Sequence, residues 1–432
     1  MRLVHLTAGT GTFHCGTCLR DVALVRALRA RGHDALLAPL YLPLVLDEEE
    51  ESGPVRMGGI NVFLAHGRHL RLPRFVQDWL DSPRLLRWAA RRGEMTQAHV
   101  LGEMTVAMLR GEEGSQRGEI EKLLVWLRGL ERPDVVLLSN ALLLGLARPL
   151  ERELGCPVLC TLQGEAPYLD ALPEPHRSAA WCATAERARD VRAFLAVSEF
   201  TAELMRARLA LHPERVHVVP NGIDAREFVP PQQRAGPPTI GYVARLCRDK
   251  GLETLVEAFL LLKRRPEFAA LRLLAAGAAL RGDRARLSAL EARLTSAGHS
   301  GAYAFQRNVN LAQKLEVLRA STVFSVPATY GESFGLYLLE AWAMGLPVVQ
   351  PEHGAFPELL RATGAGLLCR PDDPGALAEG LATLLLDGAR ARALGEAGRR
   401  AVLEHFSAER MARDVERVCR ISMPATAAVA AR

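Results

Sequence analysis

The 432-residue chain lacks an apolar run long enough to cross a membrane, because Arg, Glu or Asp interrupts each candidate before the roughly 18 to 20 residues that a spanning helix needs. It also has little net charge, +5, and its arginines are scattered among acids, which argues against nucleic-acid binding. Its eight cysteines form no evident disulfide framework, as is typical of a reducing compartment. These absences predict a globular cytoplasmic protein, and the mildly basic balance leaves room for peripheral contact with an anionic membrane.

The chain also lacks an Asp-x-Asp motif, so a metal ion that holds a diphosphate would have no obvious ligands. Cys15 and Cys18 form one close pair at the start of a predicted helix, where a thiol is acidified. A structural zinc site normally needs four ligands, and no second pair exists. The sequence therefore predicts metal-independent chemistry and leaves a thiol-based role for this pair as an alternative.

The length suits two or three folding units of roughly 150 to 200 residues. Apolar strands alternate with helices at the start of the chain and again from 134 onward, which predicts parallel sheets covered on both faces. Helical patterns alone fill the segment between, and a Pro-rich stretch precedes a second alternating series. The predicted boundaries are 1–228 for a first domain with a helical insertion at about 47–130, 229–238 for a linker, 239–405 for a second domain, and 406–432 for a C-terminal segment. A helical pattern at 391–420 would carry the chain back to the first domain, and the last residues form a frayed tail.

One motif carries most of the chemical information. Glu332 and Glu340 bracket the segment Glu-Ser-Phe-Gly-Leu-Tyr-Leu-Leu-Glu, which follows a strand-like stretch at 322–327 and is expected to open a helix. Amides at a helix N-terminus attract phosphate oxygens, and carboxylates accept hydrogen bonds from hydroxyls. A ligand with phosphates flanked by sugar hydroxyls, such as a sugar nucleotide, fits both groups.

Arg245 and Lys250 supply positive charge upstream, after a strand-like segment at 240–243. Arg offers a fixed fork of donors and Lys a point charge, so together they would neutralise a diphosphate without a metal. The simpler alternative is that these cations, like the two acids, lie on a solvated surface.

Four segments, at 219–224, 241–251, 332–340 and 354–358, resemble in sequence, order and spacing the retaining glycosyltransferases of family 4. The resemblance implies an α/β protein of the GT-B fold, with two Rossmann-like doubly wound domains that face a central cleft. It also implies transfer of a hexose-type sugar from a nucleotide-diphosphate sugar, with UDP as the default nucleotide and no cofactor. The acceptor would be a small molecule, a glycan or a lipid-linked group.

The resemblance also implies residue roles. Glu332 would hold hydroxyls of the donor sugar, Glu340 would hold the ribose, and Arg245 and Lys250 would stabilise the departing diphosphate. The catalytic set is thus Glu332, Arg245 and Lys250, and the donor-binding set is Gly11, Gly16, Gln163, Ser333, Phe334, Gly335, Leu336, Glu340 and Arg307.

Two positions depart from the family pattern. Gln163 stands where relatives carry a histidine that faces the donor sugar, and glutamine cannot titrate near neutral pH. Arg307 stands near the expected site of the base, where the family has glycine. Three other functions therefore stay open: a GT-B phosphorylase, a sugar-nucleotide epimerase, and a non-catalytic sugar-nucleotide or thiol sensor that uses Cys15 and Cys18.

Overall fold

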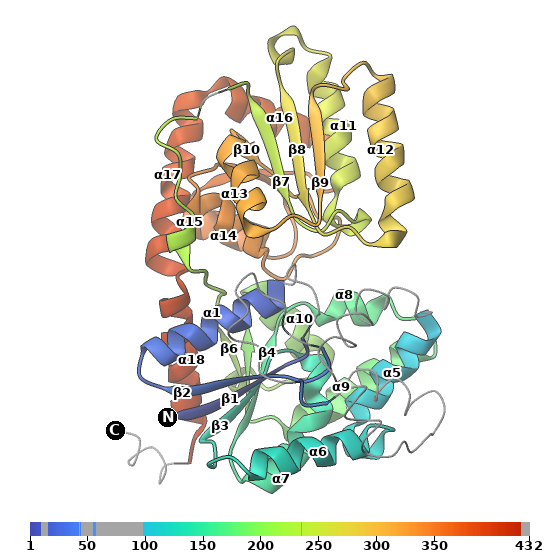
Figure 1. Ribbon diagram of the computed structural model, residues 1–432, viewed down its shortest axis with the longest axis vertical. Helices are drawn as coiled ribbons and strands as arrows, with labels where there is room; N and C mark the ends of the chain where they lie inside the picture. Colours follow the sequence, from blue (N-terminus) through green and yellow to red (C-terminus); the bar gives the residue numbers. More distant parts are fainter. Residues whose placement is uncertain (10–15, 43, 45–54, 58–97, 235, 425–432) are drawn as a thin grey trace. The chain divides into compact units, whose positions relative to one another are not determined.

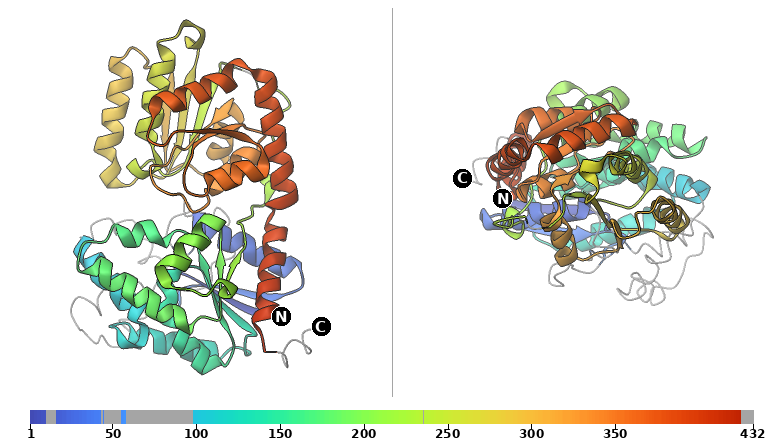
Figure 2. Two further views of the ribbon diagram at one scale, coloured as in Figure 1. Left: turned by 180° about the vertical axis from the view of Figure 1, so that it is seen from behind. Right: turned by 90° about the horizontal axis from the view of Figure 1, so that it is seen from above.

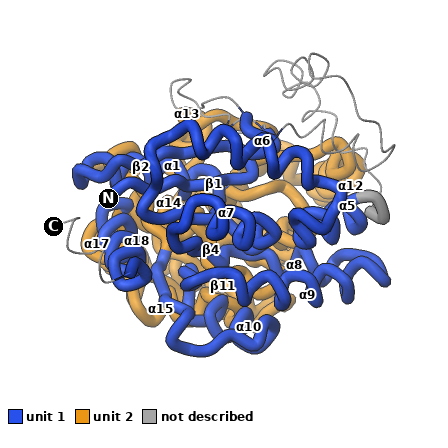
Figure 3. The backbone as a smooth tube through the Cα atoms, turned by 90° about the horizontal axis from the view of Figure 1, so that it is seen from below, with its two compact units in different colours: residues 1–220, 408–432 blue, residues 221–407 orange. Residues whose placement is uncertain are grey.

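The computed structural model describes residues 1–9, 16–42, 44, 55–57, 98–234 and 236–424. The chain divides into two compact units, shown in different colours in Figure 3. Unit 1 comprises Met1–Pro220 and Ala408–Arg432, and unit 2 comprises Asn221–Ser407. Each unit contains one six-stranded sheet in which every paired strand is parallel, as the α/β prediction requires (Figure 1).

Unit 1 has the strand order β2-β1-β3-β4-β5-β6. Its strands are β1 (Arg2–Thr7), β2 (Asp34–Pro39), β3 (Val135–Leu138), β4 (Val158–Leu162), β5 (Ala193–Ala196) and β6 (Val216–Val218). Its helices are α1 (Gly16–Ala30), α5 (Ala98–Arg110), α6 (Arg117–Arg128), α7 (Ala147–Leu154), α8 (Glu165–Asp170), α9 (His176–Arg187), α10 (Glu199–Leu209) and α18 (Ala408–Ser422). Short 3-10 turns include η3 (Gly111–Glu113), η4 (Ala141–Leu146), η5 (Ala188–Asp190) and η6 (Pro213–Arg215).

The two faces of this sheet are buried under different helices. Leu3 and Leu137 pack with residues of α1 and α18, whereas Val4 and Leu138 pack with residues of α6, α7 and α10. Successive side chains of a strand point to opposite faces, so a strand covered on both sides must be apolar throughout. This requirement explains the uninterrupted apolar runs in the sequence.

The C-terminal helix α18 is held in unit 1 by charge as well as by apolar contacts, and Figure 2 shows it (red) beside the strands. Glu416 accepts hydrogen bonds from Arg31 at 2.8 Å, lies 3.1 Å from the Nε2 of His33, and pairs with Arg420 at 2.9 Å. Burial alone would raise the pKa of Glu416, but these three basic groups outweigh it and lower the pKa to about 2. The carboxylate therefore stays charged at neutral pH.

Unit 2 has the strand order β12-β11-β10-β7-β8-β9. Its strands are β7 (Thr239–Val243), β8 (Arg272–Gly277), β9 (Tyr303–Arg307), β10 (Val323–Phe324), β11 (Val348–Pro351) and β12 (Gly366–Cys369). Its helices are α11 (Leu252–Lys263), α12 (Arg284–Ser296), α13 (Leu311–Ala320), α14 (Leu336–Ala343), α15 (Phe356–Thr363), α16 (Pro374–Leu386) and α17 (Gly388–His405). Helix α11 packs against α12 and α16, while α14 and α15 pack against α17 (Figure 1).

Two details of the predicted organisation need correction. The helical pattern at 391–420 is divided between two helices, since α17 ends at His405 and α18 begins at Ala408. Between them, the carbonyl of Phe406 accepts a hydrogen bond from the amide of Ile223 at 3.0 Å. The predicted linker at 229–238 belongs to unit 2, where Arg234 donates to the backbone carbonyls of Leu318 and Ser321. Unit 1 accordingly ends at Pro220 rather than at 228.

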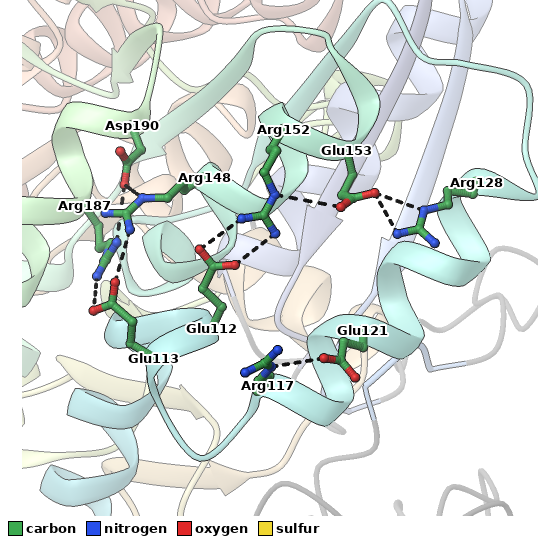
Figure 4. Close-up of polar contacts among 10 residues, drawn as sticks. All are labelled: Glu112, Glu113, Arg117, Glu121, Arg128, Arg148, Arg152, Glu153, Arg187 and Asp190. Atoms are coloured by element: carbon green, nitrogen blue, oxygen red, sulfur yellow. Dashed lines mark hydrogen bonds and ion pairs between the residues drawn. The ribbon is translucent and has the colours of Figure 1, made fainter.

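The predicted helical insertion at about 47–130 is described only in part, because 47–54 and 58–97 lie outside the described residues. Helices α5 and α6 belong to the described part of the insertion. Ion pairs join its η3 turn to the rest of unit 1 (Figure 4). Glu113 pairs with the buried Arg187 at 2.7 Å and with Arg148 at 3.1 Å, and Asp190 lies within 4 Å of both arginines. Hydrogen bonding and charge from Arg187 lower the pKa of Glu113. The same view shows the more exposed pairs Arg152–Glu112, Arg152–Glu153, Arg128–Glu153 and Arg117–Glu121.

A close backbone contact also joins η3 to η4. Gly111 has a φ of +61°, and a Cβ atom on it would lie 2.0 Å from the carbonyl oxygen of Gly145. Only glycine meets both conditions.

We therefore expect Gly111→Ala to lower the free energy of unfolding of unit 1 by about 2 to 4 kcal/mol, because the new methyl group is both strained and overlapping. Thermal unfolding followed by circular dichroism would measure the loss. The matched control is Gly118→Ala on α6, where a Cβ meets nothing within 4 Å. The control should gain about 0.5 to 1 kcal/mol from helix propensity, and equal stability of the two variants would contradict the argument.

Candidate functional site

The candidate site lies in unit 2 at the carboxyl ends of β7 and β10. From β7 the chain runs through β8 and β9 to one edge of the sheet, then returns to β10 and continues through β11 and β12 to the other edge. Because β7 and β10 are neighbours, the loops after them leave the sheet side by side in opposite directions. Such a switch point opens a crevice in which doubly wound sheets bind ligands.

Glycines allow the loops at this edge to approach closely. A Cβ atom on Gly251, which follows η8 (Arg248–Lys250), would lie 1.8 Å from the carbonyl oxygen of Pro327. One on Gly354 would lie 2.5 Å from the amide nitrogen of Glu332. Both glycines have positive φ, and the Thr329 amide donates to the carbonyl of Asp249 at 2.9 Å. The backbone therefore places the loops after β7, β10 and β11 against one another.

Glu332 and Lys250 meet across this contact. The ammonium of Lys250 pairs with Oε2 of Glu332, which also accepts from the hydroxyls of Tyr337 at 3.0 Å and Tyr330 at 3.3 Å. The side chains of Lys250 and Glu332 are only 13% and 9% exposed. Neither is a solvated surface charge, so the simpler alternative is wrong for these two residues.

All three donors converge on one oxygen of Glu332. No described residue donates to its Oε1, and that atom is not fully buried. The protein therefore orients the carboxylate through one oxygen and leaves the other able to accept a hydrogen bond from a ligand hydroxyl.

The site keeps both charges of the ion pair. Burial opposes ionisation of Glu332, but the charge and hydrogen bond of Lys250 and the two tyrosine hydroxyls outweigh it and lower its pKa. Burial likewise opposes the charge of Lys250, but Glu332 and Tyr330 raise its pKa above the ordinary value. Burial and the charge of Glu332 raise the pKa of Tyr330 to about 12, so its hydroxyl keeps its proton at neutral pH.

Glu340 shows a similar arrangement. Lys314 of α13 donates to its Oε1 at 2.7 Å, and the two side chains are 17% and 12% exposed. No described residue donates to Oε2 of Glu340. Thus Glu340, like Glu332, has a lysine partner on one oxygen.

The helix of the motif begins later than predicted. Helix α14 starts at Leu336, with Gly335 at φ +84° as its N-cap residue, so Glu332 lies in the preceding loop and Glu340 lies on the helix. Phe334 is buried and packs edge-on against Phe406 at 6.2 Å between ring centroids. Its side chain therefore belongs to the core, so Phe334, like Gly335, would reach a ligand only through its backbone.

The remaining predicted residues are distributed over both units. Arg245 is exposed, and its side chain forms no hydrogen bond or ion pair with a described residue. Arg307 pairs with Glu291 of α12 at 2.7 Å at the end of β9. Gln163 and Gly16 are in unit 1, where the Gln163 amide donates to the carbonyl of Ser139 at 2.6 Å and Gly16 begins α1. Gly11 and Cys15 lie outside the described residues, and Cys18 is buried on α1.

Sequence reasoning missed Tyr330, Tyr337 and Lys314. The two tyrosines lie two residues before and five residues after Glu332. This spacing indicated that they are close to Glu332, but it did not indicate that their hydroxyls point toward its carboxylate. Lys314 is 26 residues from Glu340 in sequence, and nothing in the local pattern pointed to their contact.

Groups of three or more His, Cys, Asp or Glu side chains that could hold a metal ion do not occur among the described residues. Over the same part of the chain, no helix combines the length and apolarity needed to cross a membrane.

Comparison with solved structures identifies the fold as GT-B. Sucrose-phosphate synthase from Thermosynechococcus elongatus is 20% identical and superimposes with a TM-score of 0.71 over 98% of this chain and 99% of that chain. Anabaena HepE in complex with UDP-glucose is 16% identical, with a TM-score of 0.67 over 97% and 99% of the two chains. The predicted fold class is confirmed.

Family comparison then identifies the group. Residues 224–401 match the family described as Glycosyl transferases group 1, and residues 102–227 match Glycosyltransferase Family 4. The chain belongs to these group 1, family 4-like glycosyltransferases, as the resemblance predicted.

Individual relatives match over shorter stretches. Alpha-maltose-1-phosphate synthase of Mycolicibacterium smegmatis is 32% identical over 48% of this chain and 56% of its own length. D-inositol 3-phosphate glycosyltransferase of Corynebacterium jeikeium is 34% identical over 42% of this chain and 46% of its own length. The chain thus spans about half the length of these relatives.

The buried ion pair predicts a pH-dependent effect on stability. We expect Glu332→Gln to lower the free energy of unfolding at pH 7 by about 3 kcal/mol, because Lys250 is left buried without a counter-charge. The pKa of Glu332 in the folded state lies below its ordinary value in the unfolded state. The ion pair therefore stabilises the folded protein fully at pH values above the unfolded-state pKa, and this stabilisation is lost as the pH falls through the folded-state pKa. The difference from wild type should therefore be constant above about pH 5 and shrink in acid.

Urea unfolding at a series of pH values would measure this difference. The control is Glu291→Gln, which removes the partner of the more exposed Arg307 and should cost about 1 kcal/mol or less. A Glu332→Gln difference that did not change with pH would contradict the assignment.

Proposed function

We propose that this protein is a retaining glycosyltransferase that moves a hexose-type sugar from a nucleotide-diphosphate sugar to an acceptor without a metal ion. The observation that carries the proposal is the pair of orienting lysines at the switch point of unit 2. Glu332 and Glu340 each have one oxygen bound by a lysine and one to which no described residue donates. Two carboxylates so prepared suit a ligand that presents hydroxyls at two separate places.

The positions of Glu332 and Glu340 support different roles for the two acids in binding the donor. Glu332 lies in the loop after β10 beside Lys250, so it would accept hydroxyls of the transferred sugar close to the diphosphate. Glu340 lies about one turn into α14, so it would accept the ribose hydroxyls. The sugar nucleotide would therefore lie along the start of α14.

Arg245 and Lys250 would stabilise the leaving diphosphate in different ways. Arg245 is exposed without a partner among the described residues and can turn its guanidinium fork to the phosphates. Lys250 is held in place by Glu332 and Tyr330, so its charge is preorganised. Preorganised donors aimed at developing charge are worth about 3 to 4 kcal/mol each in comparable sites.

UDP-sugars are the first donors to test, since HepE was solved with UDP-glucose. The acceptor class is the one named from the resemblance: a small molecule, a glycan or a lipid-linked group. Names of the sequence relatives include a sugar phosphate and an inositol phosphate, so phosphorylated polyols are suitable first candidates. No described feature favours a phosphorylase, an epimerase or a thiol sensor over transfer.

The test of the reaction is nucleotide release from UDP-, GDP- and ADP-sugars by purified protein, with and without EDTA. We expect release from one donor, unchanged by EDTA and lowered at least about a hundredfold in Glu332→Ala, which loses a transition-state contact. The control Glu121→Gln, which removes the partner of the exposed Arg117 on α6, should match wild type. Release that EDTA abolishes would contradict the metal-independent reaction, and nucleotide-independent cleavage by inorganic phosphate would indicate a phosphorylase.

The anomeric configuration of the product is a separate test. Once a donor and an acceptor are known, proton NMR of the first product formed from an α-linked donor should show an α-linkage. A β-linkage would contradict the retaining mechanism while leaving the donor site intact.

Glu340 should affect binding more than chemistry. We expect Glu340→Gln to raise the KM for the donor about tenfold with a smaller change in kcat, because a ribose contact is made equally in the ground state and the transition state. Initial-rate kinetics with the donor identified above would separate the two constants. A fall in kcat at unchanged KM would place Glu340 at the transferred sugar instead.

A further inference from the structure

A histidine to which no role has been assigned lies beside Glu332. His353 belongs to the loop between β11 and α15, and it is half-buried. The residues that follow it contact the backbone of Glu332. The Ala355 amide donates to the Glu332 carbonyl at 2.9 Å, and a Cβ atom on Gly354 would lie 2.5 Å from the Glu332 amide nitrogen. The imidazole is therefore held among the loops that form the candidate site.

Two contacts fix the position of the His353 ring. Its Nε2 lies 2.8 Å from the carbonyl oxygen of Ala328, in the loop after β10. The ring also packs edge-on against Phe356, with 6.1 Å between the ring centroids and an angle of 73° between the planes. Phe356 in turn packs against the backbone of Gly335, where a Cβ atom would lie 3.3 Å from its ring. The two nitrogens of the imidazole therefore have fixed positions in the site.

The contact with Ala328 also decides which nitrogen carries the proton in the neutral ring. A carbonyl oxygen has no hydrogen to donate, so Nε2 must be the donor of this bond. The other nitrogen, Nδ1, then has a free lone pair and is an acceptor. No described residue forms a hydrogen bond with Nδ1, and that atom is not fully buried. His353 thus offers a ligand one acceptor atom, as Glu332 does through Oε1.

The chemistry of these two acceptors restricts what they can bind together. A carboxylate oxygen and a neutral imidazole nitrogen accept hydrogen bonds from hydroxyls, and neither of them can donate. An ionised phosphate has only acceptor oxygens, so it would gain nothing at Nδ1. Neighbouring acceptors of this kind suit a group with several hydroxyls, such as a hexose.

We propose that Nδ1 of His353 accepts a hydrogen bond from a hydroxyl of the transferred sugar and thereby selects among donor sugars. This role rests on the proposed transfer reaction and extends it, because it names a residue that distinguishes sugars with and without one hydroxyl. A site that hydrogen-bonds a substrate hydroxyl rejects the analogue that lacks it, since the acceptor is then left unpaired.

Two substitutions separate this role from a structural one. The amide of His353→Gln can still donate to the Ala328 carbonyl, but it leaves no acceptor at the position of Nδ1. His353→Asn places an acceptor oxygen near that position and is too short to keep the bond to Ala328. We therefore expect His353→Asn to be the less stable variant in urea unfolding. In initial-rate kinetics with the donor that the release assay identifies, kcat/KM should fall about tenfold in His353→Gln and stay within about threefold of wild type in His353→Asn.

Monodeoxy analogues of the donor sugar test the contact itself. On wild type, the analogue that lacks the contacted hydroxyl should react with a kcat/KM about tenfold below that of the parent donor. On His353→Gln the same analogue should react as fast as the parent, because the acceptor is already absent. A structural role predicts instead that each analogue loses the same factor on both proteins.

The matched control is His299→Gln, which removes another ring that packs edge-on against a phenylalanine, Phe259, at 6.2 Å between centroids. His299 precedes β9, at the amino edge of the same sheet, so this variant should react like wild type. If His353→Asn were both less stable and less active than His353→Gln, or if the analogue effects were unchanged in His353→Gln, the proposal would be overturned and the transfer reaction would stand. Nucleotide release from no donor by wild type would overturn both.

Discussion

The burial of an ion pair at the switch point of unit 2 is the constraint on which the candidate site depends. A carboxylate taken out of water is costly unless it is paired and hydrogen-bonded. Glu332 meets this requirement with Lys250 and two tyrosine hydroxyls, and these partners come from the loops after β7 and β10 and from α14. The pair can form because glycines let the backbones of these loops approach closely, so the ion pair depends on the backbone geometry of the loops.

The lysine–glutamate pairs also determine which groups of the site can bind a ligand. Acids paired with lysines are already neutralised, so a ligand is not needed to make their burial tolerable. The charged groups that can still hydrogen-bond a ligand are one oxygen of each carboxylate and the exposed guanidinium of Arg245. Such a site would bind its ligand without large rearrangement of these side chains, which would suit preorganised stabilisation of the leaving diphosphate in the proposed reaction.

Much of the architecture was predictable because strands buried on both faces must be apolar throughout. The alternating series after the Pro-rich stretch predicted the parallel sheet of unit 2. The helix at the motif was placed four residues early, because the pattern after Glu332 is helical but the positive φ of Gly335 ends the loop there. The predicted domain boundary between 405 and 406 lies next to the break between α17 and α18, but the helical pattern at 391–420 was expected to be continuous, since both flanking segments have the composition of one helix.

The sequence by itself determined the family and the fold class, and it pointed to the two acids and two cations of the candidate site, because these depend on local residue types at fixed spacing. Only the tertiary structure decided which charges are buried and what they contact. It paired Glu332 with Lys250 and Glu340 with Lys314, and it left Arg245 exposed. These outcomes depend on contacts between segments distant in sequence, and strand order and close backbone packing set those contacts.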